Sequence, residues 1–196
     1  GTTSNLISVM FLVKDVPYDP FRDFTPLAAG IQIVDFVMVR ASLPVKSLKE
    51  LVDLAKQNPG KLSFGTIGEG TFLHFSTEML AREAGFTYLH VPFKGGGPSA
   101  IALLSGEVQL SFIIPILVAS HIKSGRLKGM AVAGQQRLPS LPDMPTFAEA
   151  GLPQFESTNW FGVLAPAKTP GTLISKLSSE LNRIQMLPDV RDKLGA

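Results

Sequence analysis

The hydrophobic and polar positions along the middle of the chain predict an alternating series of strands and helices. Ile31–Arg40 is rich in β-branched residues and predicts one buried strand. From Ser47, apolar residues recur at helical spacing as far as the stop at Asn58-Pro59-Gly60. Strands are then expected at Leu62–Gly65, Tyr88–Phe93, Val108–Ile114 and Leu127–Ala133, and helices at Thr71–Ala84, up to about Leu104, and at Ile116–Ser124. This order predicts an α/β fold with a mostly parallel sheet covered by helices.

The two ends of the chain have patterns of their own. Gly1–Asn5 is polar and predicts a loop, and an apolar stretch follows it at Leu6–Val13. Near the other end, Trp160–Ala165 predicts a strand. Apolar residues at helical spacing from Leu173 to Ile184 then predict a further helix.

Composition narrows the class of protein. Hydrophobic residues make up 45% of the chain and charged residues 17%, a balance that supports a folded core. The 18 Lys and Arg residues are scattered among 16 Asp and Glu residues, which argues against a nucleic-acid groove. No apolar run reaches the roughly 18 residues that a membrane helix needs, so the protein is not expected to be membrane-embedded. The opening residues lack the pattern of a signal peptide, so no signal peptide is expected in this chain.

Two glycine-rich turns carry most of the chemical information. Gly65–Gly70 (GTIGEG) and Lys94–Pro98 (KGGGP) each follow a predicted strand and open a predicted helix. Free N–H groups at a helix start, together with the helix dipole, form a site for an anion, and glycine lets the backbone approach a ligand closely. Thr71 either caps its helix or donates its hydroxyl to a carboxylate. The alternative is that both segments are ordinary tight turns.

Other candidate residues have weaker signals. His74 and Glu78 lie on one helix face, but no third ligand completes a metal site, so His74 is expected to be structural. Lys94 either faces an anion or lies in solvent. There is no hydrolase elbow and no nucleophile–base arrangement, and cysteine is absent. The sequence therefore predicts no catalytic residue, no metal and no cofactor.

The segment VPFKGGGPSAIALLSGEVQLSF closely resembles the substrate-binding proteins of tripartite tricarboxylate transporters, the Bug/TctC family. The resemblance extends over nearly the whole chain. The blocks VPYDPFRDFTPLA, GTIGEGTFLHFSTEMLAREAG, HIKSGRLKGMAVAG, RLPSLPDMPTFAEAGLP and NWFGVLAPAKTP all look like blocks of that family, in its order.

The resemblance implies a two-lobed periplasmic-binding-protein-like (type II) fold. Residues 1–34 and 161–196 would be parts of lobe 1, and residues 35–160 would form lobe 2, with hinge strands near 31–40 and 157–165. Family members also have a strand and a ligand loop before the position of Gly1 and a final helix after that of Ala196. Lobe 2 is thus expected to be complete and lobe 1 partial, with apolar faces left exposed.

The resemblance also implies a ligand site built from loop backbone groups. The residues carried over are Thr3 and Ser4 on a first-lobe loop, Gly70, Thr71 and Phe72 at a helix start, and Phe93 and Gly95 after the next strand. Members that bind amino acids often have an acidic residue where this chain has Ile113 in SFIIPI. Because isoleucine cannot pair with an ammonium group, amino acids are expected to be poor ligands.

The expected function is the capture of a small carboxylate in the periplasm for delivery to membrane transporter subunits, with no chemistry performed on the ligand. A second reading, which the sequence does not separate from the first, is a sensory component that presents its carboxylate to a membrane receptor.

Overall fold

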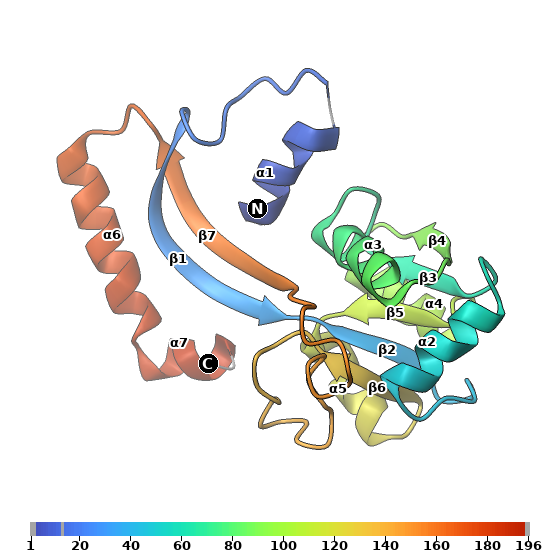
Figure 1. The fold of residues 1–196 in the computed structure, drawn as a ribbon. Coiled ribbons are helices and arrows are strands. Elements are labelled where there is room, and N and C mark those ends of the chain that lie inside the picture. The colour runs from blue at the N-terminus through green and yellow to red at the C-terminus, as the bar shows by residue number, and fades with distance from the viewer. Residues whose placement is uncertain (1–2, 13, 195–196) are drawn as a thin grey trace. The chain divides into compact units, whose positions relative to one another are not determined.

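The computed structural model describes residues 3–12 and 14–194. The chain divides into two compact units, one formed by residues 1–33 and 159–196 and the other by Val34–Thr158. The division falls where two extended segments leave one unit and enter the other, at residues 33–34 and 158–159. Figure 1 shows the elements of both units.

The second unit, Val34–Thr158, is built on a five-stranded sheet in the order β4-β3-β5-β2-β6. Its strands are β2 (Phe36–Arg40), β3 (Ser63–Thr66), β4 (Leu89–Pro92), β5 (Leu110–Ile113) and β6 (Leu127–Val132). Strand β3 pairs in parallel with both β4 and β5, as the alternating pattern predicts. Strand β2 pairs antiparallel with β5 and β6. The mostly parallel α/β sheet is therefore confirmed, with one antiparallel strand that the pattern did not reveal.

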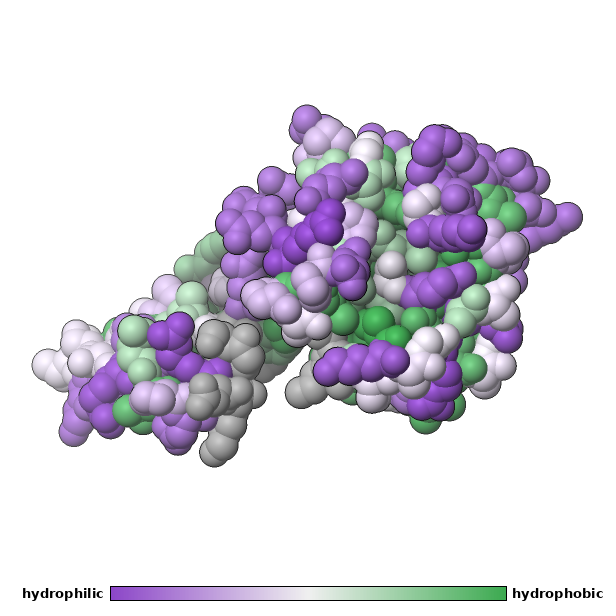
Figure 2. Space-filling model, turned by 90° about the horizontal axis from the view of Figure 1, so that it is seen from below, coloured by the Kyte–Doolittle hydropathy of each residue, from purple (hydrophilic) through white to green (hydrophobic). Residues whose placement is uncertain are grey.

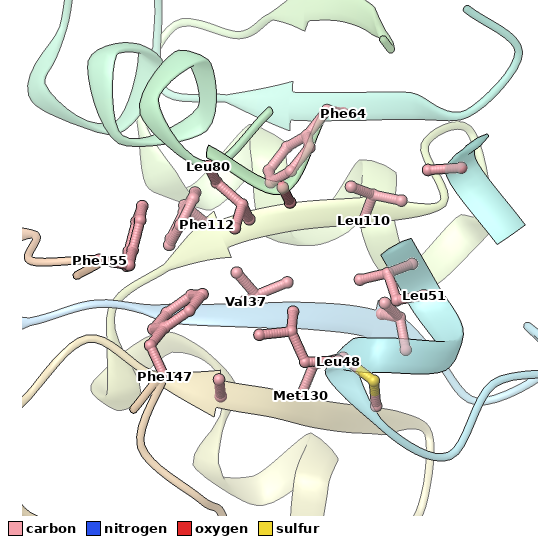
Figure 3. Packing of buried hydrophobic residues seen from close by; sticks show 14 of the residues in the cluster. Val37, Leu48, Leu51, Phe64, Leu80, Leu110, Phe112, Met130, Phe147 and Phe155 are labelled. Atoms are coloured by element: carbon pink, nitrogen blue, oxygen red, sulfur yellow. The ribbon is translucent and has the colours of Figure 1, made fainter. Parts of the chain in front are cut away.

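Four helices cover the two faces of this sheet: α2 (Leu48–Gln57), α3 (Phe72–Ala84), α4 (Gly96–Ser105) and α5 (Pro115–Lys123). Side chains of β2 alternate between two hydrophobic clusters, because successive residues of a strand point to opposite faces. Val37 and Val39 join the cluster that α2 and α3 cover, and Phe36 and Met38 join the cluster that includes residues of α4 and α5. Figure 3 shows the first cluster, in which the rings of Phe112, Phe147 and Phe155 pack against one another.

The expected single strand Ile31–Arg40 is wrong in one respect. Strand β1 (Phe24–Val34) ends at Val34 and β2 begins at Phe36, and the two strands belong to different sheets. Asp35, between them, is fully buried, and its backbone oxygen accepts the N–H of Ala133 at 2.9 Å. The β-branched pattern therefore continues through a point at which the chain passes from one unit to the other.

The first unit contains a two-stranded sheet of β1 and β7 (Thr158–Pro166) and the helices α1 (Thr3–Leu12), α6 (Gly171–Gln185) and α7 (Pro188–Leu194). Ser178 of α6 donates its hydroxyl to the backbone oxygen of Leu27 in β1 at 2.7 Å. The expected loop at Gly1–Asn5 is wrong from residue 3 onward, since α1 begins at Thr3. Serine, threonine and asparagine are common at helix starts, so a polar segment before an apolar stretch fits a first helical turn as well as a loop.

Apolar side chains of the first unit are exposed, as expected for a partial lobe. None of the residues of α6 is buried, and its side chains Leu173, Leu177 and Ile184 keep 38–45% of their surface in solvent. Hydrophobic residues, coloured green, also reach the surface on the face of the molecule drawn in Figure 2.

Candidate functional site

The turn Gly65–Gly70 connects the end of β3 to the start of α3. Gly68 and Gly70 have positive φ angles of 138° and 69°, in a region that side chains with a Cβ rarely adopt. Thr71 is the N-cap residue of α3, yet its side chain makes no cap hydrogen bond. Its hydroxyl donates to the backbone oxygen of Gly68 at 2.7 Å instead. Thr71 therefore holds the turn together, and of its two expected roles the helix cap is not observed.

The turn after β4 has a similar construction. Gly95, the N-cap residue of α4, has a φ of 105° and makes no side-chain cap. The N–H groups of Gly96 and Gly97 make no hydrogen bond within the described part of the chain, and Pro98 has no N–H. The start of α4 therefore presents free backbone donors where the helix dipole is positive.

Two hydrogen bonds join these turns. Phe93 donates its N–H to the oxygen of Thr66 at 2.9 Å, and Gly95 donates its N–H to the oxygen of Ile67 at 3.2 Å. Because β3 and β4 are parallel neighbours, their carboxyl ends meet at one edge of the sheet, and the starts of α3 and α4 meet there too. The resulting arrangement can bind an anion through backbone N–H groups.

The start of a third helix, α5, lies next to α4. Strand β5 also runs parallel to β3, and α5 begins directly after it, with Ile114 as N-cap. A Cβ added to Gly96 would lie 2.7 Å from Cδ1 of Leu117, so α5 approaches the start of α4 closely. A side chain at Gly96 would therefore require the flexible end of the Leu117 side chain to move.

The expected site residues do not all present free groups to this edge. The N–H of Gly70 is taken by Nδ1 of His74 at 3.0 Å, and the N–H of Gly95 is taken by Ile67. Phe72 and Phe93 are half-buried and pack against the first and second hydrophobic clusters. Lys94 is exposed, which fits the expectation that its side chain lies in solvent.

Ile113 is fully buried in the second hydrophobic cluster together with Phe36, Val118 and Val132. In this arrangement its side chain has no surface with which to touch a solute, so its expected role as a ligand contact stays a prediction. Thr3 and Ser4 belong to the first turn of α1 rather than to a loop, which corrects that expectation. Their side chains lie outside the described residues.

Two histidines meet beside the turn, a contact for which the sequence holds no signal. The imidazole rings of His74 and His90 stack with centroids 3.9 Å apart and planes 10° apart. Nε2 of His90 lies 2.7 Å from Oγ1 of Thr66, at the start of the glycine-rich turn. Burial, followed by the neighbouring His74, lowers the pKa of His90 from its ordinary 6.5. No group of three metal-ligating side chains is found among the described residues, His74 and His90 included.

Comparison with known proteins places the chain in a family. Residues 2–196 match the model of the tripartite tricarboxylate transporter family receptor, TctC. A protein encoded in the tcbD-tcbE intergenic region of Pseudomonas sp. (strain P51) is 35% identical over 98% of this chain, which covers 57% of that protein. Within the described residues, no helix is both long and apolar enough to cross a membrane.

Two solved structures have a closely similar fold. R. palustris Rpa4515, solved with adipate, has a TM-score of 0.83 and 32% identity over 92% of this chain and 60% of its own. MatC from Rhodopseudomonas palustris, solved with malate, has a TM-score of 0.84 and 30% identity over 94% of this chain and 63% of its own. The chain thus spans less than two thirds of the length of each of these relatives. From the family match and these similarities, the chain belongs to the tripartite tricarboxylate transporter family receptors, the TctC family.

Proposed function

We propose that the protein is an extracytoplasmic solute-binding protein that captures a small carboxylate and performs no chemistry on it. The observation that carries the proposal is the pair of uncapped helix starts, α3 and α4, at one sheet edge. The hydrogen bond from Gly95 to Ile67 holds the two turns together. Backbone N–H groups at such positions favour negative charge without supplying a nucleophile or a base.

The solved relatives support the chemical class of the ligand. Adipate and malate, named with two of the similar structures, are both small dicarboxylates. A dicarboxylate offers two groups that can each accept charge-assisted hydrogen bonds. Capture with a micromolar dissociation constant corresponds to about 8 kcal/mol, which a few such bonds and modest apolar burial can provide.

The finer part of the proposal concerns location and selectivity. As a member of a family of transporter receptors, the protein would work in the periplasm and deliver its ligand to membrane transporter subunits. We further infer that amino acids are poor ligands, because position 113, where amino-acid-binding members of the family often have an acidic residue, holds a buried isoleucine that supplies no carboxylate to an ammonium group. Tight binding of glutamate in a calorimetric titration would contradict this inference.

Gly97 offers a direct test of the helix start as the carboxylate site. Replacing Gly97 with proline removes one backbone N–H at a first-turn position, where helices tolerate proline. Gly97→Ala is the matched control, since it keeps the N–H and its new Cβ meets nothing within 4 Å. Calorimetric titration with adipate should use the protein expressed from its whole gene.

The two variants should differ in affinity although both fold. Loss of a hydrogen bond to a charged ligand costs about 1.5–3 kcal/mol, so Gly97→Pro should weaken adipate binding by roughly tenfold or more. Gly97→Ala should bind adipate as the wild type does. Equal affinities for the two variants, with native circular dichroism, would show that the start of α4 does not hold the carboxylate.

A further inference from the structure

Two imidazole rings hold the glycine-rich turn from one side. His74 is the third residue of α3, and His90 lies in β4, and their rings stack almost in parallel. His74 reaches back four residues to accept the N–H of Gly70, and His90 contacts the hydroxyl of Thr66. The same hydroxyl lies 3.4 Å from the N–H of Gly68, so both rings are bonded to the turn that precedes α3.

The hydrogen bond to Gly70 fixes the protonation of one ring. A backbone N–H is always a donor, so Nδ1 of His74 must offer its lone pair and carry no proton. The proton of the neutral ring therefore sits on Nε2, on the side where Oε1 of Glu78 lies 3.7 Å away. That carboxylate oxygen already accepts the hydroxyl of Tyr88 at 2.5 Å.

We propose that His74 is a positioning residue for the carboxylate site, holding the glycine-rich turn through Gly70 and thereby making ligand affinity depend on pH. This inference rests on the proposed function. Gly70 adopts a φ of 69°, a conformation that its hydrogen bond to His74 helps to select. The orientation of this peptide unit sets the direction in which the following N–H groups at the start of α3 point.

Acid removes the acceptor on which this arrangement depends. Histidine changes its charge between about pH 5 and 8, and a proton on Nδ1 of His74 would place two donors against each other. The turn would then have to leave its bound geometry, which weakens carboxylate binding.

The charged and titratable groups around the pair come from three segments. His90 lies across the stack, Glu78 lies on α3, Glu69 lies on the turn, and Tyr88 meets the edge of the His90 ring with centroids 6.4 Å apart. Glu69 and Glu78 raise the pKa of His90, against the larger lowering by burial and by His74. A protonated imidazole would attract the anionic ligand and strengthen binding in acid, whereas loss of the hydrogen bond to Gly70 weakens binding. The sign of the pH dependence of the affinity therefore shows which effect is larger.

The test is the adipate dissociation constant of the protein expressed from its whole gene, measured from pH 5 to pH 8. We expect the wild type to lose about tenfold or more in affinity at pH 5. His74→Asn keeps an acceptor close to the position of Nδ1 but does not titrate, so it should bind like the wild type at pH 8 and keep that affinity at pH 5. His74→Leu has no acceptor and should bind weakly at both pH values.

His121→Asn is the matched control, since His121 lies on α5 and its Nδ1 has no hydrogen-bond partner among the described residues. This variant should keep the pH dependence of the wild type. The proposal is overturned if His74→Asn keeps the wild-type pH dependence, if affinity rises toward pH 5, or if His74→Leu binds normally at pH 8.

A second measurement needs no ligand and separates this inference from the proposed function. Nitrogen-15 spectra of the imidazoles should show His74 unprotonated at Nδ1 at pH 8, and the amide signal of Gly70 should move in His74→Leu, which removes the acceptor. If neither adipate nor any other carboxylate binds at any pH while these signals appear, the proposed function has failed and the positioning of the turn has not. If Nδ1 of His74 carries the proton at pH 8, the positioning role is refuted whether or not adipate binds.

Discussion

Asp35 carries a buried carboxyl group whose ionisation should govern the stability of the protein. The residue is fully buried, and neither carboxylate oxygen has a hydrogen-bond partner among the described residues. Desolvation disfavours the charged form, and it raises the pKa of Asp35 from 3.8 to about 7. A carboxyl group in this position is expected to be protonated in mildly acidic solution.

The sign of the effect on stability follows from proton counting. Between about pH 4 and pH 7 the folded protein keeps the proton of Asp35 and the unfolded chain has lost it, so folding becomes less favourable as the pH rises. Each pH unit in this window costs about 1.4 kcal/mol. About two of the three pH units between pH 5 and pH 8 fall in this window. The free energy of unfolding should therefore decrease by roughly 3 kcal/mol over that range.

Asp35→Asn removes the ionisable group with almost no change in shape. Urea unfolding at pH 5 and pH 8 should show that the wild type loses about 3 kcal/mol more than the variant does between the two pH values. Asp143→Asn is the control, because Asp143 is exposed, and its pH dependence should match that of the wild type. The reasoning is refuted if Asp35→Asn and the wild type lose the same stability between pH 5 and pH 8.

Three further substitutions test the framework around the turns. Ser111→Ala removes a hydroxyl that donates to the oxygen of Gly65 at 2.8 Å, and thermal unfolding should show a loss of about 1–3 kcal/mol. Lys128→Met removes an ammonium that donates to two backbone oxygens at 2.6 and 2.8 Å, and urea unfolding should show a similar loss. Gly95→Ala places a Cβ in open space but at a φ of 105°, so about 1–3 kcal/mol of strain should appear in thermal unfolding, whereas Gly97→Ala should cost far less.

The sequence predicts those parts of the structure that depend on local pattern. Helix periodicity and glycine stops place α2 and α3 within a residue or two, because an amphipathic face and its ends are encoded nearby in the chain. The two glycine-rich turns are also local features, and each one opens a helix as expected. The family resemblance, which extends over nearly the whole chain, is confirmed by the family match.

Features that depend on pairing between distant segments are not predictable in this way. The antiparallel direction of β2 appears only in its pairing with β5 and β6, which come later in the chain. The stack of His74 on His90 joins α3 to β4, where His90 lies opposite Phe64. The burial of Ile113 has a similar origin, since helices cover both faces of β5 and leave neither of its alternating sides in solvent. The break at Asp35 is hidden because the residues on both sides of it favour a strand.

Carboxylate capture is tested most directly by a thermal-shift titration of the protein expressed from its whole gene. The ligand panel should hold monocarboxylates, aliphatic and aromatic dicarboxylates including adipate and malate, and sugars and amines of matched size. At a concentration 100 times the dissociation constant, a ligand adds about 2.7 kcal/mol to the stability of the folded state. We expect at least one carboxylate to raise the melting temperature by several degrees in a saturable manner, with no shift from the sugars or amines. The absence of a shift with every carboxylate, or a larger shift with a sugar or an amine, would contradict the account.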